Sequence, residues 1–201
     1  MNEQILILIP AAGRSSRMGG TDKLMERVGD TPLLARQVAR ALATGAQVLV
    51  TLNSDFPARA TALPPGAATA LIPDAAEGLA ASLRAGARHA RAMTPRPTAL
   101  MVLLPDLPDL TTDDLDTLLT AHAKAPDHIH QATAADGTPG HPVIFPAHLF
   151  AEFAGLTGDQ GAKPLMQCAK IHHTALPGTH ATRDLDTPEA WAAWRAENPA
   201  P

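Results

Sequence analysis

The feature that most constrains this chain is a short apolar run, Ile5 to Ile9, followed at once by the small-residue turn Pro10-Ala11-Ala12-Gly13. Five apolar residues are too few to span a membrane, and they suit a strand that is buried on both faces. The pattern predicts a strand that ends at Pro10. Because alanine and glycine have almost no side chain, backbone N–H groups in this turn can approach a phosphate group closely.

Basic and hydroxyl residues continue this turn and favour anion binding. Arg14, Arg17 and Lys23 bring positive charge, and Ser15 lies among them. The order of residues fits neither the Walker pattern, which needs Gly-Lys-Ser/Thr, nor the dinucleotide pattern Gly-x-Gly-x-x-Gly. Taken alone, the turn leaves open an ordinary strand-to-loop connection with solvated basic residues.

Composition narrows the classes of function. A length of 201 residues suits one domain, and the net charge of -4 argues against a nucleic-acid-binding surface. Neither a signal peptide nor a membrane span is recognisable, so we expect a cytoplasmic protein without a membrane partner. The single cysteine, Cys168, excludes an intramolecular disulfide and a cysteine-based zinc site.

Strand-like and helix-like segments alternate in the first half of the chain. The pattern predicts strands at 48–52, 70–72 and 99–104 and helices at 32–43 and 78–91. Such alternation is typical of a single α/β domain, a Rossmann-like three-layer sandwich with a mostly parallel sheet. Ligands in these folds bind beyond the carboxyl ends of the strands.

The second half predicts a less regular series of elements. We expect helices that start at Thr111 or Thr112 and around 149–153 and 164–169, strands at 141–145 and 171–175, and a final helix with Trp191 and Trp194. The acidic residues Asp113, Asp114 and Asp116 fall in the first turns of a helix. The simplest interpretation is that they are surface charges favoured by the helix dipole.

Carboxylates in two segments are candidates for a metal site. Asp106 directly follows a buried strand, and Asp184 and Asp186 share one face of an extended segment. Magnesium prefers such hard oxygen ligands. Turn capping by Asp106 and helix capping by Asp186 or Thr187 are the open alternatives.

The nine histidines raise the question of a histidine metal site. Their spacings match no common zinc pattern, and neighbouring residues of a strand face opposite sides. We therefore expect surface or solvated side chains for the following six: His122, His128, His130, His172, His173 and His180.

Several segments together resemble the molybdenum cofactor cytidylyltransferase and guanylyltransferase-like nucleotidyltransferases, the MobA-like family. The similar segments are the loop after the first strand, Glu77 to Gly86, Asp106-Leu107-Pro108, Gly140 to Val143 with Thr157 to Lys163, and Asp184 to Glu189. They cover nearly the whole chain in the family's order. The resemblance implies one domain of the nucleotide-diphospho-sugar transferase type over residues 1–201. Its nucleotide-binding half spans about 1–110 and its acceptor-binding half about 111–195.

The resemblance also implies roles for individual residues. Catalytic roles fall to Arg17, Lys23 and Asp106, metal binding to Asp106, Asp186 and Asp184, and acceptor binding to His141, Asp159 and Lys163. Nucleotide binding falls to Ala11, Ala12, Gly13, Arg14, Ser15, Arg17, Lys23 and Ser82.

The implied reaction is transfer of CMP from CTP to molybdenum cofactor (molybdopterin), with Mg²⁺ or alternatively Mn²⁺, and release of pyrophosphate. Ala11-Ala12, where guanine-using members tend to have Gly-Gly, favours CTP, and the Ala12 methyl group offers a physical reason if it narrows the space beside the base. A molybdoenzyme or its maturation factor is the expected protein partner. GTP-dependent guanylyl transfer and sugar-phosphate nucleotidyl transfer stay open. A non-catalytic cofactor-delivery protein also stays open, because Pro105 stands where the family usually has glycine.

Overall fold

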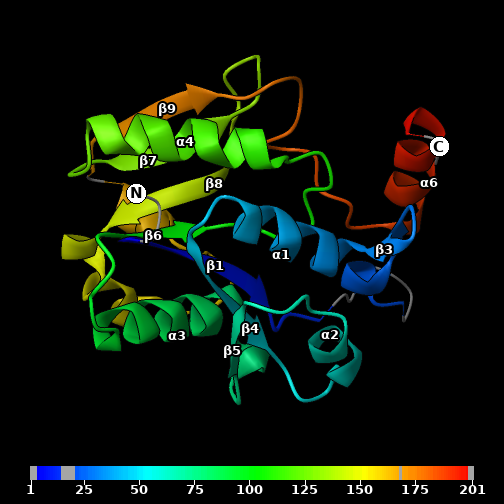
Figure 1. Cartoon of the computed structure of the whole chain (residues 1–201), viewed down its shortest axis with the longest axis horizontal. Coiled ribbons are helices and arrows are strands. Elements are labelled where there is room, and N and C mark those ends of the chain that lie inside the picture. Colours follow the sequence, from blue (N-terminus) through cyan, green and yellow to red (C-terminus); the bar gives the residue numbers. More distant parts are fainter. Residues whose placement is uncertain (1–3, 15–20, 168, 199–201) are drawn as a thin grey trace.

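The computed structural model describes residues 4–14, 21–167 and 169–198. Within these ranges seven strands form one sheet in the order β5-β4-β1-β6-β8-β7-β9, with helices on both faces (Figure 1). The strands are β1 (Ile5–Ala11), β4 (Gln47–Leu52), β5 (Ala68–Leu71), β6 (Ala99–Val102), β7 (Ile129–Thr133), β8 (Pro139–Pro146) and β9 (Ile171–Ala175). Two further short strands, β2 (Arg27–Val28) and β3 (Thr31–Pro32), pair with each other.

The sheet is mostly parallel, which confirms the predicted fold class. Parallel pairing joins β5, β4, β1 and β6, and it joins β7 to β9. β8 alone runs antiparallel to its two neighbours, β6 and β7. The sheet therefore changes direction between β6 and β8, close to the predicted boundary between its two halves.

Helices cover both faces of the sheet, as Figure 1 shows for α1 and α4 on one side and α3 on the other. The α-helices are α1 (Leu33–Ala43), α2 (Pro57–Thr61), α3 (Leu79–Ala92), α4 (Thr112–Lys124), α5 (Lys163–Met166) and α6 (Pro188–Glu197). Short 3₁₀ helices lie at η3 (Lys23–Met25), η4 (Ala75–Glu77), η5 (Ala147–Leu149) and η6 (Glu152–Gly155). No helix in the described ranges is long and apolar enough to cross a membrane.

The side chains of β1 point alternately to the two faces of the sheet, which explains why helices pack on both faces. Ile5, Ile7 and Ile9 pack with α1 and α4, whereas Leu6 and Leu8 pack with α3. Burying each such side chain contributes about 1.5–3 kcal/mol, so β1 is a strong determinant of the three layers.

The predicted end of β1 at Pro10 is wrong by one residue. The strand continues to Ala11, with Pro10 in register with Thr51 of β4. Pairing with β6 extends only to Leu8. A proline at this end of the strand therefore interrupts little of the ladder.

Two expectations for the second half are wrong. The segment 149–153 forms the 3₁₀ turns η5 and η6 instead of an α-helix. In this tighter geometry residues three apart share a side, and Phe150 and Phe153 both face the core. Asp114 is buried: it forms a capping box with Thr111 and accepts a hydrogen bond from Nδ1 of His180 at 2.8 Å.

The expectation of surface or solvated histidines is also wrong for His122 and His130, whereas His128, His172 and His180 are half-buried. His122 and His130 are buried between α4 and β7, with ring centroids 5.2 Å apart. His130 also contacts His172 at 5.2 Å, and His172 contacts His128 at 4.5 Å. We call the side chains of His122, His128, His130 and His172 the histidine cluster. Only His173 of the predicted set is exposed.

Candidate active site

Lys23 and two of the predicted metal carboxylates meet at the carboxyl edge of the sheet. Lys23, on η3, donates from Nζ to Oδ2 of Asp106 at 2.6 Å and to Oδ1 of Asp186. Asp106 lies in the turn after β6, and Asp186 precedes α6. Three segments that are distant in sequence thus supply one charged cluster.

The pKa values in this cluster reflect both burial and charge. Burial opposes the positive charge of Lys23, but Asp106 and Asp186 outweigh it and raise its pKa above the ordinary value. Burial and the negative charges of Asp186 and Asp106 raise the pKa of Asp184. Asp184 therefore lies close enough to Asp186 and Asp106 to interact with them electrostatically.

The Asp106 turn is held from two sides. Gln37 and Arg40, both on α1, donate to the backbone oxygens of Leu107 and Pro108, the latter at 2.9 Å. The backbone N–H of Leu185 donates to the backbone oxygen of Asp106 at 3.2 Å. The second contact fixes the Asp184–Asp186 segment against the Asp106 turn.

The carboxylates form an oxygen-rich set suited to a hard divalent cation. Oδ1 of Asp106 is buried and has no hydrogen-bond partner among the described residues. Within those residues no three His, Cys, Asp or Glu side chains converge as a preformed metal site. Lys23 instead lies between Asp106 and Asp186, which keeps the two negative charges compensated.

The turn after β1 borders a pocket of about 410 Å³. Of the predicted nucleotide-binding residues, Gly13, Arg14 and Ser82 line it, together with Pro10, Ala75, Ala76, Gly78, Leu79 and Asp159. Arg14 is exposed and pairs with Asp55 at 2.9 Å. Ser15 and Arg17 lie outside the described residues.

Ala11 and Ala12, although predicted to bind nucleotide, do not line this pocket. Both are buried, and the Ala12 methyl group packs in a small core with Ile72, Ala81 and Ala85. The methyl group therefore points into the core and cannot narrow the pocket beside a base. The suggested steric reason for a CTP preference is wrong, and the preference rests on the resemblance alone.

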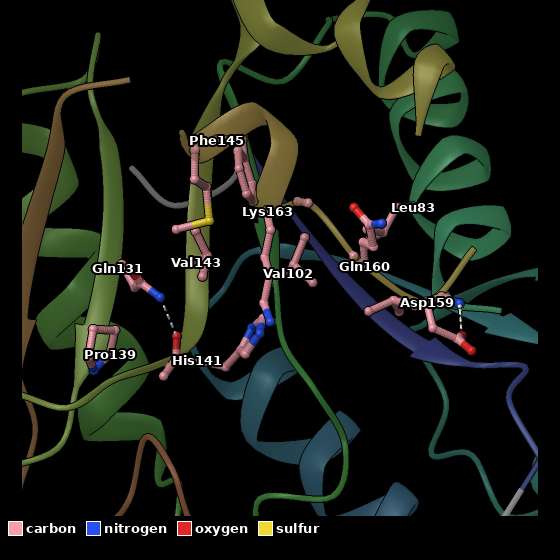
Figure 2. A pocket seen from close by; sticks show the side chains of 15 residues that line it. Leu83, Val102, Gln131, Pro139, His141, Val143, Phe145, Asp159, Gln160 and Lys163 are labelled. Atoms are coloured by element: carbon pink, nitrogen blue, oxygen red, sulfur yellow. Dashed lines mark hydrogen bonds between the residues drawn. The ribbon is translucent and has the colours of Figure 1, made fainter. Parts of the chain in front are cut away.

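A second pocket, of about 290 Å³, brings the three predicted acceptor residues together. His141, Asp159 and Lys163 all line it. Figure 2 shows Gln131 and Pro139 on one side and Leu83, Gln160 and Asp159 on the other. The remaining lining residues are Leu79, Val102, Gly140, Val143, Phe145, Gly161, Ala162 and Met166.

Asp159 and Leu79 border both pockets. The N–H of Leu79, at the start of α3, donates to Oδ1 of Asp159 at 3.2 Å. Gly78 permits this approach because its φ is +105° and a Cβ there would lie 2.0 Å from the same oxygen. The carboxylate is thus fixed where the two pockets meet.

His141 is placed by a close backbone contact. Its N–H donates to the oxygen of Ala181 at 2.8 Å, and a Cβ on the preceding Gly140 would lie 2.0 Å from that oxygen. Burial lowers the pKa of His141, while the Val102 backbone and Asp106 act in the opposite direction. A neutral imidazole at neutral pH can accept or donate a hydrogen bond in the pocket.

Sequence reasoning missed Gln131, Arg59 and Asp22 as residues of this region. Gln131 lines the second pocket beside Gln160, which belongs to the predicted segment Thr157 to Lys163, and the buried Arg59 contacts Asp22 and the backbone of Ala11 and Gly13. Gln131 belongs to no charged motif. For Arg59 the only sequence signal is an arginine beside Phe56 and Pro57 in a short apolar segment, which does not indicate burial.

Comparisons with known proteins identify the family of this chain. A family model described as MobA-like NTP transferase domain matches residues 7–175. A search of curated protein sequences found no match. The crystal structure of Rv0371c from Mycobacterium tuberculosis H37Rv is 30% identical with a TM-score of 0.81, covering 96% of this chain and 97% of that chain.

Two further solved structures are similar. Rv0371c in complex with manganese is 27% identical with a TM-score of 0.77, covering 94% of this chain and 97% of that chain. CMP:2-keto-3-deoxy-manno-octonic acid synthetase complexed with CTP has a TM-score of 0.73 at 16% identity, covering 96% and 97%, and is similar in fold. Because the family model matches most of the chain, this protein belongs to the MobA-like NTP transferase family, a family of nucleotidyltransferases.

Proposed function

We propose that this protein transfers CMP from CTP to the phosphate of molybdenum cofactor (molybdopterin) and releases pyrophosphate. The observation that carries the proposal is the position of the Lys23–Asp106–Asp186 cluster at the sheet edge where β1 and β6 end. Two adjoining pockets, which share Asp159, are consistent with one site for the triphosphate and one for the acceptor.

A divalent cation, Mg²⁺ or Mn²⁺, fits the residues present. Asp106 and Asp186 would hold it, with Asp184 assisting, and the unpartnered buried Oδ1 of Asp106 offers a ligand atom. The manganese complex of Rv0371c supports the use of a divalent cation. Such an ion neutralises phosphate charge when it is bound.

The reaction brings two anions together, so alignment and charge compensation are its main requirements. An oxygen of the acceptor phosphate attacks the α-phosphorus and forms a P–O bond, while the bond from the α-phosphorus to the bridging oxygen breaks and pyrophosphate leaves. The acceptor phosphate is already ionised, so no strong general base is needed. Lys23, Arg17 and backbone N–H groups from Ala12 to Ser15 would hold the β- and γ-phosphates.

The second pocket favours a flat heterocyclic acceptor over a sugar phosphate. Its walls include Leu83, Val102, Val143, Phe145 and Met166, which offer apolar contact but few hydrogen bonds. A polyol in such walls would leave hydroxyl groups unpaired, at about 1–3 kcal/mol for each buried group. Polar contacts come from Gln131, His141, Asp159, Gln160 and Lys163, which suits a pterin ring with a phosphate.

The proposal is tested by pyrophosphate release from CTP, GTP, UTP or ATP with molybdopterin and Mg²⁺ or Mn²⁺. We expect release with CTP and formation of the cytidylylated cofactor. When CTP and GTP compete for limiting molybdopterin, a dominant guanylyl product would overturn the choice of base. Binding of molybdopterin without any pyrophosphate release would favour a delivery protein instead. Release with sugar phosphates but not with molybdopterin would overturn the acceptor.

A further inference from the structure

Arg59 is the largest fully buried charged side chain among the described residues, and the proposed reaction does not use it. Its side chain is 0% exposed. A buried guanidinium is strongly destabilising unless its N–H groups are paired. Arg59 donates from Nε and Nη2 to the two oxygens of Asp22, at 2.7 and 2.8 Å, and its Cζ lies 4.3 Å from the ring centroid of Phe56. The guanidinium is therefore held in one orientation.

The same guanidinium contacts both ends of the segment 11–22, between β1 and η3, which we call the phosphate loop. Nη1 donates to the backbone oxygens of Ala11 and Gly13, at 2.7 and 2.8 Å, where the loop begins. Asp22 lies where the loop ends, immediately before Lys23. One side chain on the short helix α2 thus ties together two points that are eleven residues apart in sequence, Ala11 and Asp22.

These contacts also orient the backbone at the start of the loop, from Ala11 to Arg14. In a trans peptide the C=O and the following N–H point in opposite directions. With the oxygens of Ala11 and Gly13 directed at Arg59, the N–H groups of Ala12 and Arg14 point away from it. Gly13 and Arg14 line the first pocket. The arrangement turns backbone donors away from the protein's own cation and leaves them available to an anion.

Asp22 extends the same connection to the charged cluster. Its Oδ1 also accepts the N–H of Leu24 at 3.1 Å, which caps the 3₁₀ helix η3. Lys23 is the first residue of η3, and its Nζ reaches Asp106 and Asp186. The orientation of the Lys23 backbone therefore depends on the pair formed by Arg59 and Asp22.

We propose that Arg59 is a positioning residue that sets the phosphate loop and Lys23 for binding of the nucleoside triphosphate. The role rests on the proposed function for the identity of the ligand. The link to Lys23 runs through Asp22, and the link to the loop runs through the oxygens of Ala11 and Gly13. Arg59 itself faces the start of the loop from the core and is fully buried, so its role is indirect.

The test compares R59K, D22N, the double variant and the control R195K. R59K keeps the positive charge but lacks the planar fork, and D22N keeps the size of the side chain and one oxygen acceptor. R195K alters an arginine–carboxylate pair on the surface, with Glu26 at 2.6 Å. Calorimetry measures the Kd for CTP with Mg²⁺, and thermal unfolding is recorded in parallel.

We expect R59K and D22N each to raise the Kd about tenfold or more while the protein stays folded. The double variant should bind CTP only slightly more weakly than R59K, because the two substitutions disrupt the same Arg59–Asp22 pair. R195K should stay within about twofold of the wild type. An unchanged Kd in R59K together with a lower Tm would reduce Arg59 to a stabilising core residue and overturn the proposal.

A second measurement needs no nucleotide and separates this proposal from the proposed function. Brief trypsin digestion followed by mass spectrometry compares cleavage after Arg14 and Lys23 with cleavage after the exposed Arg91 on α3. In R59K, selective acceleration at Arg14 and Lys23 supports the positioning role even if the wild type binds no triphosphate, a result that would defeat only the proposed function. Equal acceleration at all three sites, or none, overturns the positioning role.

Discussion

The ammonium group of Lys23 lies 2.6 Å from Oδ2 of Asp106, a residue 83 positions further along the chain. The contact joins the loop that follows the first strand of the sheet to the turn that follows β6. Lys23 therefore links the segment expected to hold phosphate with the segment expected to hold a metal ion. Substitutions of the two residues should consequently have different effects on binding and turnover.

Asp106→Ala should fold and lose turnover by at least about a hundredfold, because the carboxylate contributes to the charged site and not to the core. Asp186→Ala should behave similarly, and Asp184→Ala more mildly. Pyrophosphate release and Mn²⁺ binding measured by electron paramagnetic resonance provide the check. Asp113→Ala, an exposed acid at the start of α4, is the control. Undiminished Mn²⁺ binding in Asp106→Ala would contradict the metal assignment.

Lys23→Ala should lower kcat/KM for the triphosphate roughly tenfold or more, since charge-assisted contacts to phosphate contribute about 1.5–3 kcal/mol. It also removes the positive charge that lies between Asp106 and Asp186. Mn²⁺ should therefore raise the Tm of Lys23→Ala more than it raises the Tm of the wild type. Steady-state kinetics and thermal unfolding measure the two effects. Arg17→Ala should share the kinetic effect, and wild-type kinetics in both variants would show that the loop does not bind phosphate.

Acid should destabilise the protein through the histidine cluster. Burial, and then the neighbouring His130, lower the pKa of His122 from 6.5 to about 4, while Asp127 acts in the opposite direction. Burial likewise lowers the pKa of His130. The hydrogen bond to the Ala125 backbone oxygen raises this pKa, and the neighbouring His172 and His128 lower it. The unfolded chain therefore binds protons more readily than the folded one. Stability from His122 is complete above pH 6.5 and is lost as the pH falls toward 4.

Urea unfolding at pH 7.5 and pH 5 measures this loss. His122→Leu should reduce the difference in unfolding free energy between the two pH values by roughly 2 kcal/mol, given about 1.4 kcal/mol per pKa unit. The exposed His173→Leu is the matched control and should leave the difference unchanged. An equal pH dependence in wild type and His122→Leu would show that the cluster is not the origin of acid sensitivity.

Gly78→Ala should destabilise the protein more than Gly137→Ala. Both glycines have positive φ, +105° and +88°, but an added Cβ meets Asp159 only at Gly78 and open space at Gly137. The backbone penalty alone is about 1 kcal/mol, so Gly137→Ala isolates it. The additional loss in Gly78→Ala, measured by urea unfolding, should accompany weaker CTP binding because Asp159 is displaced. Equal losses in the two variants would mean that Asp159 moves away without consequence.

The parts of the fold that could be predicted are those in which local pattern and burial agree. β1 and β6 are continuous apolar runs, and β9 begins and ends at the predicted residues, 171 and 175. β7 was missed because His130 and Gln131 interrupt its apolar pattern, although His130 is buried against the other histidines. Buried polar groups depend on partners that are distant in sequence.

The same limit applies to the candidate site. The spacing of Asp184 and Asp186 predicted a shared face, and Asp186 does meet Lys23 beside Asp106. The pairing of Asp114 with His180, 66 residues away, left no trace in the local pattern. Arg59 is comparable, because the acceptors it meets among the described residues come from two segments that only the folded sheet brings beside α2.

The change of strand direction between β6 and β8 has an evolutionary consequence. The first pocket is bordered mainly by loops of the parallel strands, whereas β8 and the segment leading into α5 supply most of the polar lining of the second. Substitutions on β8 can therefore reshape the second pocket while leaving the loop and its arginine support intact. Under the proposed function, a scaffold of this kind can exchange one acceptor for another by local drift, and Asp159 and Leu79, which border both pockets, are the positions where such drift is most constrained.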